Sequence, residues 1–223
     1  MNQENAFSFE KAQQTFLQRV YQWMAIGLTL TGAIAYTVSG NMGLMRSLAG
    51  GGFLILMLVE LGIVFWLSSQ ALKLSPQAAV TGFLVYSGLN GLTMAYIFLV
   101  YTGASIASTF LITAGTFASV SFYGYATKTD LSSMRGFLFM GLIGILIASL
   151  VNIFMKSPAL YWIISYAGVA IFMGLTAYDT QKLKAMQERG GATEQHAVLG
   201  ALMLYLDFIN MFIFLLRIFG RRR

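Results

Sequence analysis

Three carboxylic acids lie where the surrounding residues are almost all apolar, and they are the first candidates for chemistry in this 223-residue sequence. Of the eight acidic residues, Glu60, Asp179 and Asp207 fall in or beside long apolar runs, and no Lys or Arg lies deep in those runs to neutralise them. A charge inside a bilayer is costly, so acids there usually line water-filled paths, share protons or pair across helices. The sequence therefore directs attention to these three side chains.

The positions of Asp179 and Asp207 allow the two side chains to meet. Asp179 lies five residues before Lys184, and Asp207 lies seven residues after Gly200. If Lys184 and Gly200 mark the membrane boundary, the two acids are about 7 and about 10 Å deep at a rise of about 1.5 Å per residue. If the last helix starts at His196 instead, Asp207 lies about 16 Å deep. Contact is therefore allowed but not required.

Two aspartates in contact would form a pH sensor. At a distance of about 4 Å and an effective dielectric constant of about 20, two full charges repel by about 4 kcal/mol, so the pair should share one proton. We predict that Asp179 and Asp207 form such a gate and bind Ca²⁺ weakly, because two or three acids are too few for a tight site. The alternative is a packing role, with each acid permanently protonated or hydrogen-bonded, for example Asp207 to Tyr178.

Two further polar residues are candidates for an ion pathway that includes Asp207. Asn210 follows Asp207 by three positions and so lies on the same helix face. Glu60 lies eight residues after Gly52, about 12 Å into its span at about 1.5 Å per residue. We predict that Glu60 is an ion-binding acid or a member of a proton relay, and a structural hydrogen bond is the alternative.

The apolar runs between charge clusters have the lengths of membrane helices. Hydrophobic residues make up 57% of the chain and charged residues 10%, which is typical of a membrane protein. A helical crossing needs about 20 residues, and these runs are apolar on all sides, unlike the alternating strands of a β-barrel. The predicted fold is an all-α integral membrane protein with seven spans: 20–38, 50–69, 77–99, 105–126, 136–155, 159–183 and 198–218.

The spans form one predicted membrane domain, residues 20–219, between a cytoplasmic tail at 1–19 and a basic C-terminal tail at 220–223. Positive residues mark the cytoplasmic side. With a cytoplasmic N-terminus, eight Lys and Arg residues before the last span lie on that side, against Arg46 and Lys156 on the other. The arginines after the last span lie outside if that span crosses fully, which we favour, or inside if it is re-entrant.

Local signals mark where helices begin and where they pack. The pairs Ser75-Pro76 and Ser157-Pro158 are typical of helix starts, because serine caps the first turn and proline fits within it. Asp130 is expected to cap a helix in the same way. Four glycines are expected to let helices approach closely: Gly27, Gly32, Gly141 and Gly144.

Composition excludes several classes of function. The net charge of +6 is dispersed over loops, which fits topology and anionic lipids better than a nucleic-acid surface. The chain has no cysteine and a single histidine, so thiolate chemistry, disulfides and histidine-based metal sites are excluded. No lysine lies within the last span to form a retinal Schiff base. We expect no bound cofactor, with the lipid bilayer as the surrounding medium.

Four stretches together resemble the transmembrane Bax inhibitor motif family, also called the Bax inhibitor-1 family, and in particular its bacterial inner-membrane members. The likeness extends over nearly the whole chain, and the two aspartate motifs occur in the family's order. The stretches are YSGLNGLTMAYIFLVYT (86–102), YGYATKTDLS (123–132), TAYDTQKLK (176–184) and LYLDFIN (204–210).

The resemblance implies a multi-pass protein of the cell inner (plasma) membrane whose last helix is surrounded by the other six. It also implies a pH-responsive calcium leak, with Asp179 and Asp207 as the sensing pair and Glu60 as the second-helix glutamate. Members with a latch use a basic residue on the second helix. This chain has none there, and Lys73 in the following loop is the nearest candidate for a latch.

Two other classes of function remain open. Family members are linked to stress protection, so the chain could be an adaptor that regulates a membrane-bound protease or a stress response. An intramembrane aspartyl protease would also use a Tyr-Asp such as Tyr178-Asp179. Its second motif would be Gly-x-Gly-Asp, whereas bulky residues precede the aspartate at 204–207, so we do not expect an enzyme. The oligomeric state is left open.

Overall fold

The computed structural model describes residues 3–48, 51–189 and 193–223, and its regular elements there are helices. A single isolated β-bridge joins Tyr101 and Arg222 within the described residues. Six of the seven predicted spans each lie along one long helix over their described residues, and the span 77–99 runs over α4 and α5. In chain order the elements are α1 (Gln3–Ser39), α2 (Met42–Leu48), α3 (Gly51–Gln70), η1 (Ala71–Lys73), α4 (Pro76–Met94), α5 (Ile97–Val100), α6 (Gly103–Ala126), η2 (Leu131–Met134), α7 (Arg135–Met155), α8 (Pro158–Glu188) and α9 (Glu194–Phe219).

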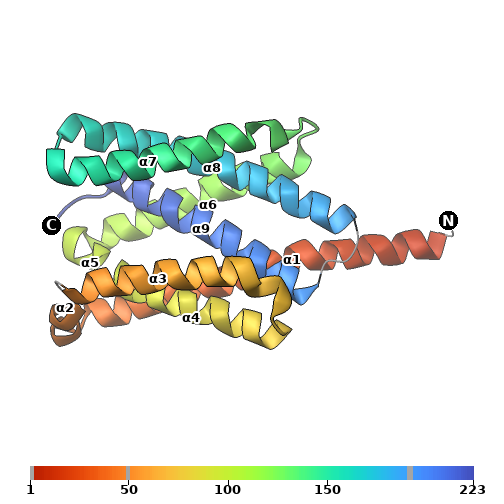
Figure 1. Cartoon of the computed structure of the whole chain (residues 1–223), viewed down its shortest axis with the longest axis horizontal. Helices are drawn as coiled ribbons and strands as arrows, with labels where there is room; N and C mark the ends of the chain where they lie inside the picture. The colour runs from red at the N-terminus through yellow and green to blue at the C-terminus, as the bar shows by residue number, and fades with distance from the viewer. Residues whose placement is uncertain (1–2, 49–50, 190–192) are drawn as a thin grey trace. The chain divides into compact units, whose positions relative to one another are not determined.

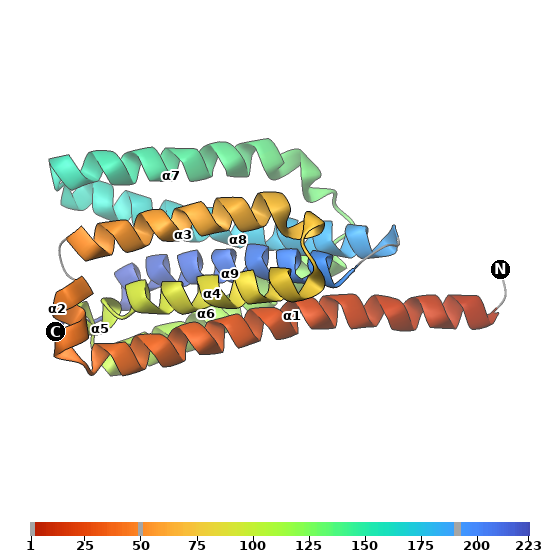
Figure 2. The ribbon, with the colours of Figure 1, turned by 60° about the horizontal axis from the view of Figure 1, so that its bottom comes forward.

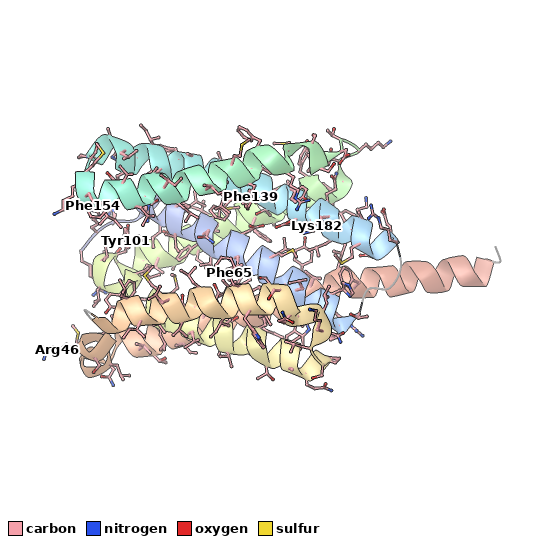
Figure 3. The ribbon with its side chains drawn as sticks, viewed as in Figure 1. Arg46, Phe65, Tyr101, Phe139, Phe154 and Lys182 are labelled. Carbon is pink, nitrogen blue, oxygen red and sulfur yellow. The ribbon has the colours of Figure 1, made fainter. Side chains whose placement is uncertain are left out.

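Six helical segments in the described part of the chain are long and apolar enough to cross a membrane: α3, α4 with α5, α6, η2 with α7, α8 and α9. The prediction of an all-α membrane protein is confirmed. Large apolar side chains point outward from these helices, as lipid-facing residues do; Phe65, Phe139 and Phe154 are 72%, 60% and 85% exposed (Figure 3).

The first predicted span, 20–38, lies within α1, which is not among those six helices. Threonines and glycines dilute its apolar stretch, so the seventh crossing stays a prediction. The helix begins at Gln3, so the residues expected to form a tail are continuous with this span.

The chain divides into two compact units. Unit 1 comprises Met1–Val100 and Ala185–Tyr205, and unit 2 comprises Tyr101–Lys184 and Leu206–Arg223. The helix α9 contributes its first half to unit 1 and its second half to unit 2. The single membrane domain over residues 20–219 stays a prediction.

Unit 1 is organised around α1 and α4, which lie side by side (Figure 2). Two glycines make this close approach possible. A Cβ at Gly27 would lie 2.5 Å from Phe83, and one at Gly91 would lie 2.8 Å from the Cβ of Ile34. The short α2 and the span α3 complete this part of the chain, with η1 leading from α3 into α4.

The predicted span 77–99 is interrupted, since α4 ends at Met94 and α5 begins at Ile97. The Thr93 hydroxyl has two acceptors within reach of its one hydrogen, the backbone carbonyl of Asn90 at 2.9 Å and the carboxyl group of Glu60 at 2.8 Å. Side-chain bonds of this kind compete with the helical ladder. The break follows directly after these polar residues, which the span count treated as part of one apolar run.

Unit 2 contains α6, η2, α7, α8 and the second half of α9, and α7 and α8 lie antiparallel with a short turn between them (Figure 1). Glycines again set the contacts. A Cβ at Gly141 on α7 would lie 2.6 Å from Ile171 on α8, and one at Gly168 on α8 would lie 2.6 Å from Phe214 on α9. The structure thus confirms close packing at Gly27 and Gly141, but the same prediction is wrong for Gly32 and Gly144, which have open space beside them.

The predicted helix caps are present. The Ser75 hydroxyl accepts a hydrogen bond from the backbone nitrogen of Ala78 at 3.3 Å, and the Ser157 hydroxyl accepts one from Leu160 at 3.4 Å. Asp130 caps η2 by accepting a hydrogen bond from the Ser132 backbone nitrogen at 2.9 Å. Hydrogen bonds from the backbone and side chain of Ser132 hold the pKa of Asp130 below its usual range. The Ser-Pro pairs need no functional interpretation.

Candidate functional site

Asp207 is the most deeply buried acid that the structure describes, on the most deeply buried span. In the most apolar stretch of α9, 78% of the residues are buried, against 39% or less in each of the other five spans. Asp207 itself is 4% exposed, and its Oδ2 atom has no hydrogen-bond partner. A carboxylate oxygen without a partner is costly in a low-dielectric interior, so this group needs a proton, a cation or water at some stage of function.

Aromatic side chains from α6 fix the segment of α9 that carries Asp207. The ring of Phe208 lies 5.3 Å from that of Phe110 and 5.5 Å from that of Phe117, centre to centre. Both distances lie in the range of favourable aromatic pairs. The position of Asp207 in unit 2 is therefore set by the packing of the adjacent residue, Phe208, against α6.

Asp179 lies on α8 in the same unit, and its carboxylate interacts electrostatically with that of Asp207. The side chain of Asp179 is only partly buried, unlike that of Asp207. Direct contact between the two carboxylates, which the sequence allowed, stays a prediction. No hydrogen bond between the two carboxylates is found within the described residues, and none joins Asp207 to Tyr178.

Lys182 is a partner of Asp179 that the sequence analysis missed. It follows Asp179 by three positions on α8 and interacts with its charge. Residues three apart on a helix are neighbours, so the signal was available in DTQK. Lys182 lies one turn after Asp179 and two turns before the end of α8 at Glu188, so it is not deep in the span.

The helix that carries Asp179 packs closely on α6. A Cβ at Gly124 would collide with the backbone of Ala177, and the Thr180 hydroxyl donates to Ser121 at 3.4 Å. Further along α8, Lys184 donates to the Tyr125 carbonyl at 2.9 Å and lies 4.7 Å from the centre of its ring. These contacts hold the aspartate between two fixed points.

Gln181 joins α8 to the loop that follows α6. Its amide nitrogen donates to the Thr129 carbonyl, and its oxygen accepts from the Leu131 backbone nitrogen, each at 2.8 Å. The loop that contains Asp130 is therefore attached directly to α8, the helix that carries Asp179.

Glu60 lies at a second polar cluster, in unit 1. Its Oε1 atom accepts a hydrogen bond from the Thr93 hydroxyl at 2.8 Å, and Asn90 also bonds to its carboxyl group. Hydrogen bonds at Glu60, which the sequence analysis gave as the alternative, are therefore present, and its role in ion binding or proton transfer stays a prediction.

A buried chain of hydrogen bonds continues from Asn90 to α9 and α1. The Tyr205 hydroxyl donates to the Asn90 side chain at 3.2 Å and shares a hydrogen bond of 2.7 Å with Thr31. The Thr31 hydroxyl also lies 2.8 Å from the Ser87 carbonyl. The sequence analysis missed Thr31, Asn90, Thr93 and Tyr205, although Tyr205 stands in the LYLD motif itself.

The remaining predicted site residues are placed as follows. Asn210 lies one turn beyond Asp207. Its side-chain amide nitrogen donates a hydrogen bond to the Leu206 carbonyl of the same helix at 2.8 Å. Glu60 and the aspartate pair belong to different units, so the ion pathway through Glu60, Asp207 and Asn210 stays a prediction.

Lys73 is exposed at the end of η1, and no ion pair of Lys73 is found among the residues that the structure describes. Glu194 makes a charged contact that the sequence analysis did not anticipate. It accepts from Arg19 at 2.9 Å and from the Trp23 indole at 2.7 Å. The start of α9 is thus attached to α1, while the latch at Lys73 stays a prediction.

The C-terminal end of α9 lies beside the turns at one end of unit 2. The backbone nitrogen of Thr102 donates to the Arg221 carbonyl at 3.0 Å, and the Arg222 side chain donates to the Tyr161 hydroxyl at 3.3 Å. The helix is continuous from Glu194 to Phe219, which favours the crossing over the re-entrant reading of the last span. In Figure 3, Tyr101 and Phe154 lie at this end of the unit and Lys182 at the other.

The acids that the structure describes are too dispersed for a site with three or more side-chain ligands. No group of three or more His, Asp or Glu side chains that could hold a metal ion occurs among the described residues. Asp179 and Asp207 offer two carboxylates, which is too few for a tight Ca²⁺ site without water or carbonyl oxygens.

The profile of a family described as inhibitor of apoptosis-promoting Bax1 matches residues 13–223 of this chain. The inner membrane protein YbhL of Escherichia coli K12 is 51% identical over 217 residues, which cover 94% of this chain and 93% of YbhL. An uncharacterized protein of Borreliella burgdorferi is 45% identical over 93% of this chain and 92% of its own length. The uncharacterized protein RP147 of Rickettsia prowazekii is 42% identical over 97% of this chain and 93% of its own.

Proposed function

Because the chain belongs to the Bax inhibitor-1 family, we propose that it is a passive, pH-sensitive cation leak in the cell inner membrane, with Ca²⁺ as the transported ion. The observation that carries the proposal is the buried Asp207, whose Oδ2 atom lacks a partner while its carboxyl group interacts with Asp179. The location follows from the name of the Escherichia coli relative and from the six apolar helices.

The gate is the proton shared by Asp179 and Asp207. Two neighbouring carboxylates repel strongly when both are ionised in a poorly solvated site. Loss of the shared proton therefore favours separation of α8 and α9 at this point, or entry of a cation between the two groups. Either response couples the protonation of the pair to passage of ions.

The hydrogen-bonded chain at Glu60 supports a second role in the same function. Thr93, Asn90, Tyr205 and Thr31 each carry a polar atom within hydrogen-bond distance of the next member. The members of such a chain polarise one another in a low dielectric, and Glu60 is its carboxylic acid, the kind of group from which proton relays in membranes are made. We assign Glu60 to proton transfer on this basis.

Flux through purified protein in liposomes loaded with a calcium dye tests the proposal. Asp179→Asn and Asp207→Asn should each remove the pH dependence of Ca²⁺ flux. Asp130→Asn is the matched control, because it removes the same charge from an exposed cap in the same unit. Flux and pH dependence that survive both pair substitutions would refute the leak proposal.

The two other classes of function predict different results in the same preparation. A protease would cleave a membrane-embedded peptide substrate, and both pair substitutions would abolish that cleavage. The structure gives this class little support, because Leu204 and Tyr205, which precede Asp207, are 0% exposed. An adaptor would show no flux in liposomes but would co-purify with a membrane-bound protease.

A further inference from the structure

A pocket of about 480 Å³ lies in unit 2, away from the aspartate pair. It is formed where α7 ends, α8 begins and α9 ends, and we call it the basic pocket. The residues that line it include six with polar or aromatic side chains: Asn152, Lys156, Tyr161, Trp162, Arg217 and Arg222.

The charge of the basic pocket is uncompensated. Three cationic side chains line it, and no acidic residue is among its lining residues. No ion pair joins Lys156, Arg217 or Arg222 to a carboxylate in the part of the chain that the structure describes. Three like charges that converge without a counter-charge repel one another, so a bound anion would be stabilised there.

Aromatic rings hold the two arginines in place. The guanidinium of Arg217 lies 5.7 Å from the centre of the Tyr161 ring and 5.1 Å from that of Phe214. Arg222 lies 5.7 Å from the Tyr161 ring and donates to its hydroxyl. A guanidinium has five N–H donors in a fixed plane, so these contacts leave donors available for the oxygens of a phosphate group.

Lys156 occupies a backbone position that suits glycine. Its φ and ψ angles are 48° and 33°, and it is the one non-glycine residue with a positive φ among those described. Glycine adopts this left-handed conformation without steric cost and is the usual residue at such helix ends. Lysine thus takes this position at a steric cost that glycine would not have, and its side chain lines the basic pocket.

The surroundings of the pocket are those of a bilayer surface. Trp162 is 43% exposed, and Phe154 and Met155, just before Lys156, are 85% and 65% exposed (Figure 3). Tryptophan and tyrosine gather at the level of lipid headgroups. The exposed side chains of α7 offer an apolar surface for an acyl chain next to the cationic pocket.

We propose that the basic pocket binds the phosphate group of an anionic phospholipid, with the acyl chains along the exposed apolar residues at the end of α7. This site is independent of the proposed leak pathway and of the aspartate pair. Basic pockets between membrane helices are known to hold lipid headgroups. A zwitterionic lipid fits less well, because its ammonium group would meet three cationic side chains.

Native mass spectrometry of the purified chain with phosphatidylglycerol and phosphatidylcholine tests the site. Arg217→Gln with Arg222→Gln should weaken phosphatidylglycerol binding by roughly tenfold or more, since each arginine supplies charged hydrogen bonds. Lys128→Gln with Arg135→Gln is the matched control, with the same charge change at the other end of unit 2. Lys156→Gly should also weaken binding, while the thermal midpoint stays the same or rises.

Three results would overturn the proposal. The first is equal binding of phosphatidylglycerol by the wild-type chain and the variants of the basic pocket, and the second is an equal loss in the control variant. The third is displacement of the lipid by inorganic phosphate at millimolar concentration, which would identify a site for soluble phosphate instead. Lys156→Gly keeps the test decisive if the arginine variants fail to fold.

Discussion

At the scale of single residues, the burial of Asp207 and the absence of a partner at its Oδ2 atom are the features that a packing role explains least. A carboxyl group retained only for packing would be expected to bond a neighbouring side chain, as Glu60 bonds Thr93. The different environments of Glu60 and Asp207 therefore suggest different tasks, a hydrogen-bonded relay member and a gate.

Tyr205→Phe tests the hydrogen-bonded chain of unit 1. The substitution removes the hydroxyl that bonds Asn90 and Thr31 and should lower the free energy of unfolding by about 1 kcal/mol, the usual value for a hydrogen bond between helices. Thermal unfolding in detergent measures the change. Tyr36→Phe removes an equivalent hydroxyl from a tyrosine that is 71% exposed and should leave stability unchanged. Equal effects of the two substitutions would contradict a structural role for the chain.

At the scale of the elements, α8 is positioned for the aspartate pair by its contact with α6. The close approach at Gly124 and the bonds of Gln181 and Lys184 fix α8 on both sides of Asp179. Small residues of this kind let helix backbones meet in a membrane.

Gly124→Ala should displace α8 from α6. Because the added Cβ would collide with the Ala177 backbone, we expect a loss of about 1–3 kcal/mol in unfolding free energy, as for other overpacked sites. Gly115→Ala on the same helix has open space beside it and should be neutral or slightly stabilising, since alanine favours helix over glycine. Thermal unfolding of both variants measures the two effects. A Gly124→Ala protein as stable as the wild type would show that the close contact at Gly124 is not required.

Element positions were largely predictable from the sequence, because apolar length and Ser-Pro caps are local signals. The interruption after Met94 was not, since residues 77–99 read as one uncharged, mostly apolar run in the sequence. The same limit applies to the site. Two aspartates in apolar surroundings could be paired by depth, whereas the bonds of Tyr205 to Thr31 and Asn90 depend on which faces of α1, α4 and α9 meet.

At the scale of the whole molecule, the continuous helix α9 and the contacts of Arg221 and Arg222 place the C-terminal tail at the end of unit 2 that carries Lys156. Charge bias predicts that Lys128, at the other end of this unit, is cytoplasmic. The tail would then lie on the opposite side of the membrane, in spite of its positive charge.

Single-cysteine labelling tests this topology without background, because the chain contains no cysteine. A membrane-impermeant thiol reagent added to intact cells that have a permeabilised outer membrane should label Arg223→Cys and spare Lys128→Cys. Labelling of Lys128→Cys alone would reverse the orientation, and equal labelling of both would contradict a full crossing.

The most direct test of the central claim is a double-mutant cycle on the aspartate pair, read as the pH profile of Ca²⁺ flux in liposomes. If the two residues share one proton, Asp179→Asn and Asp207→Asn each remove the pH dependence, and the double variant shows no further change, because coupled groups are not additive. Independent effects that sum in the double variant, or a pH profile that survives in either single variant, would contradict the shared-proton gate.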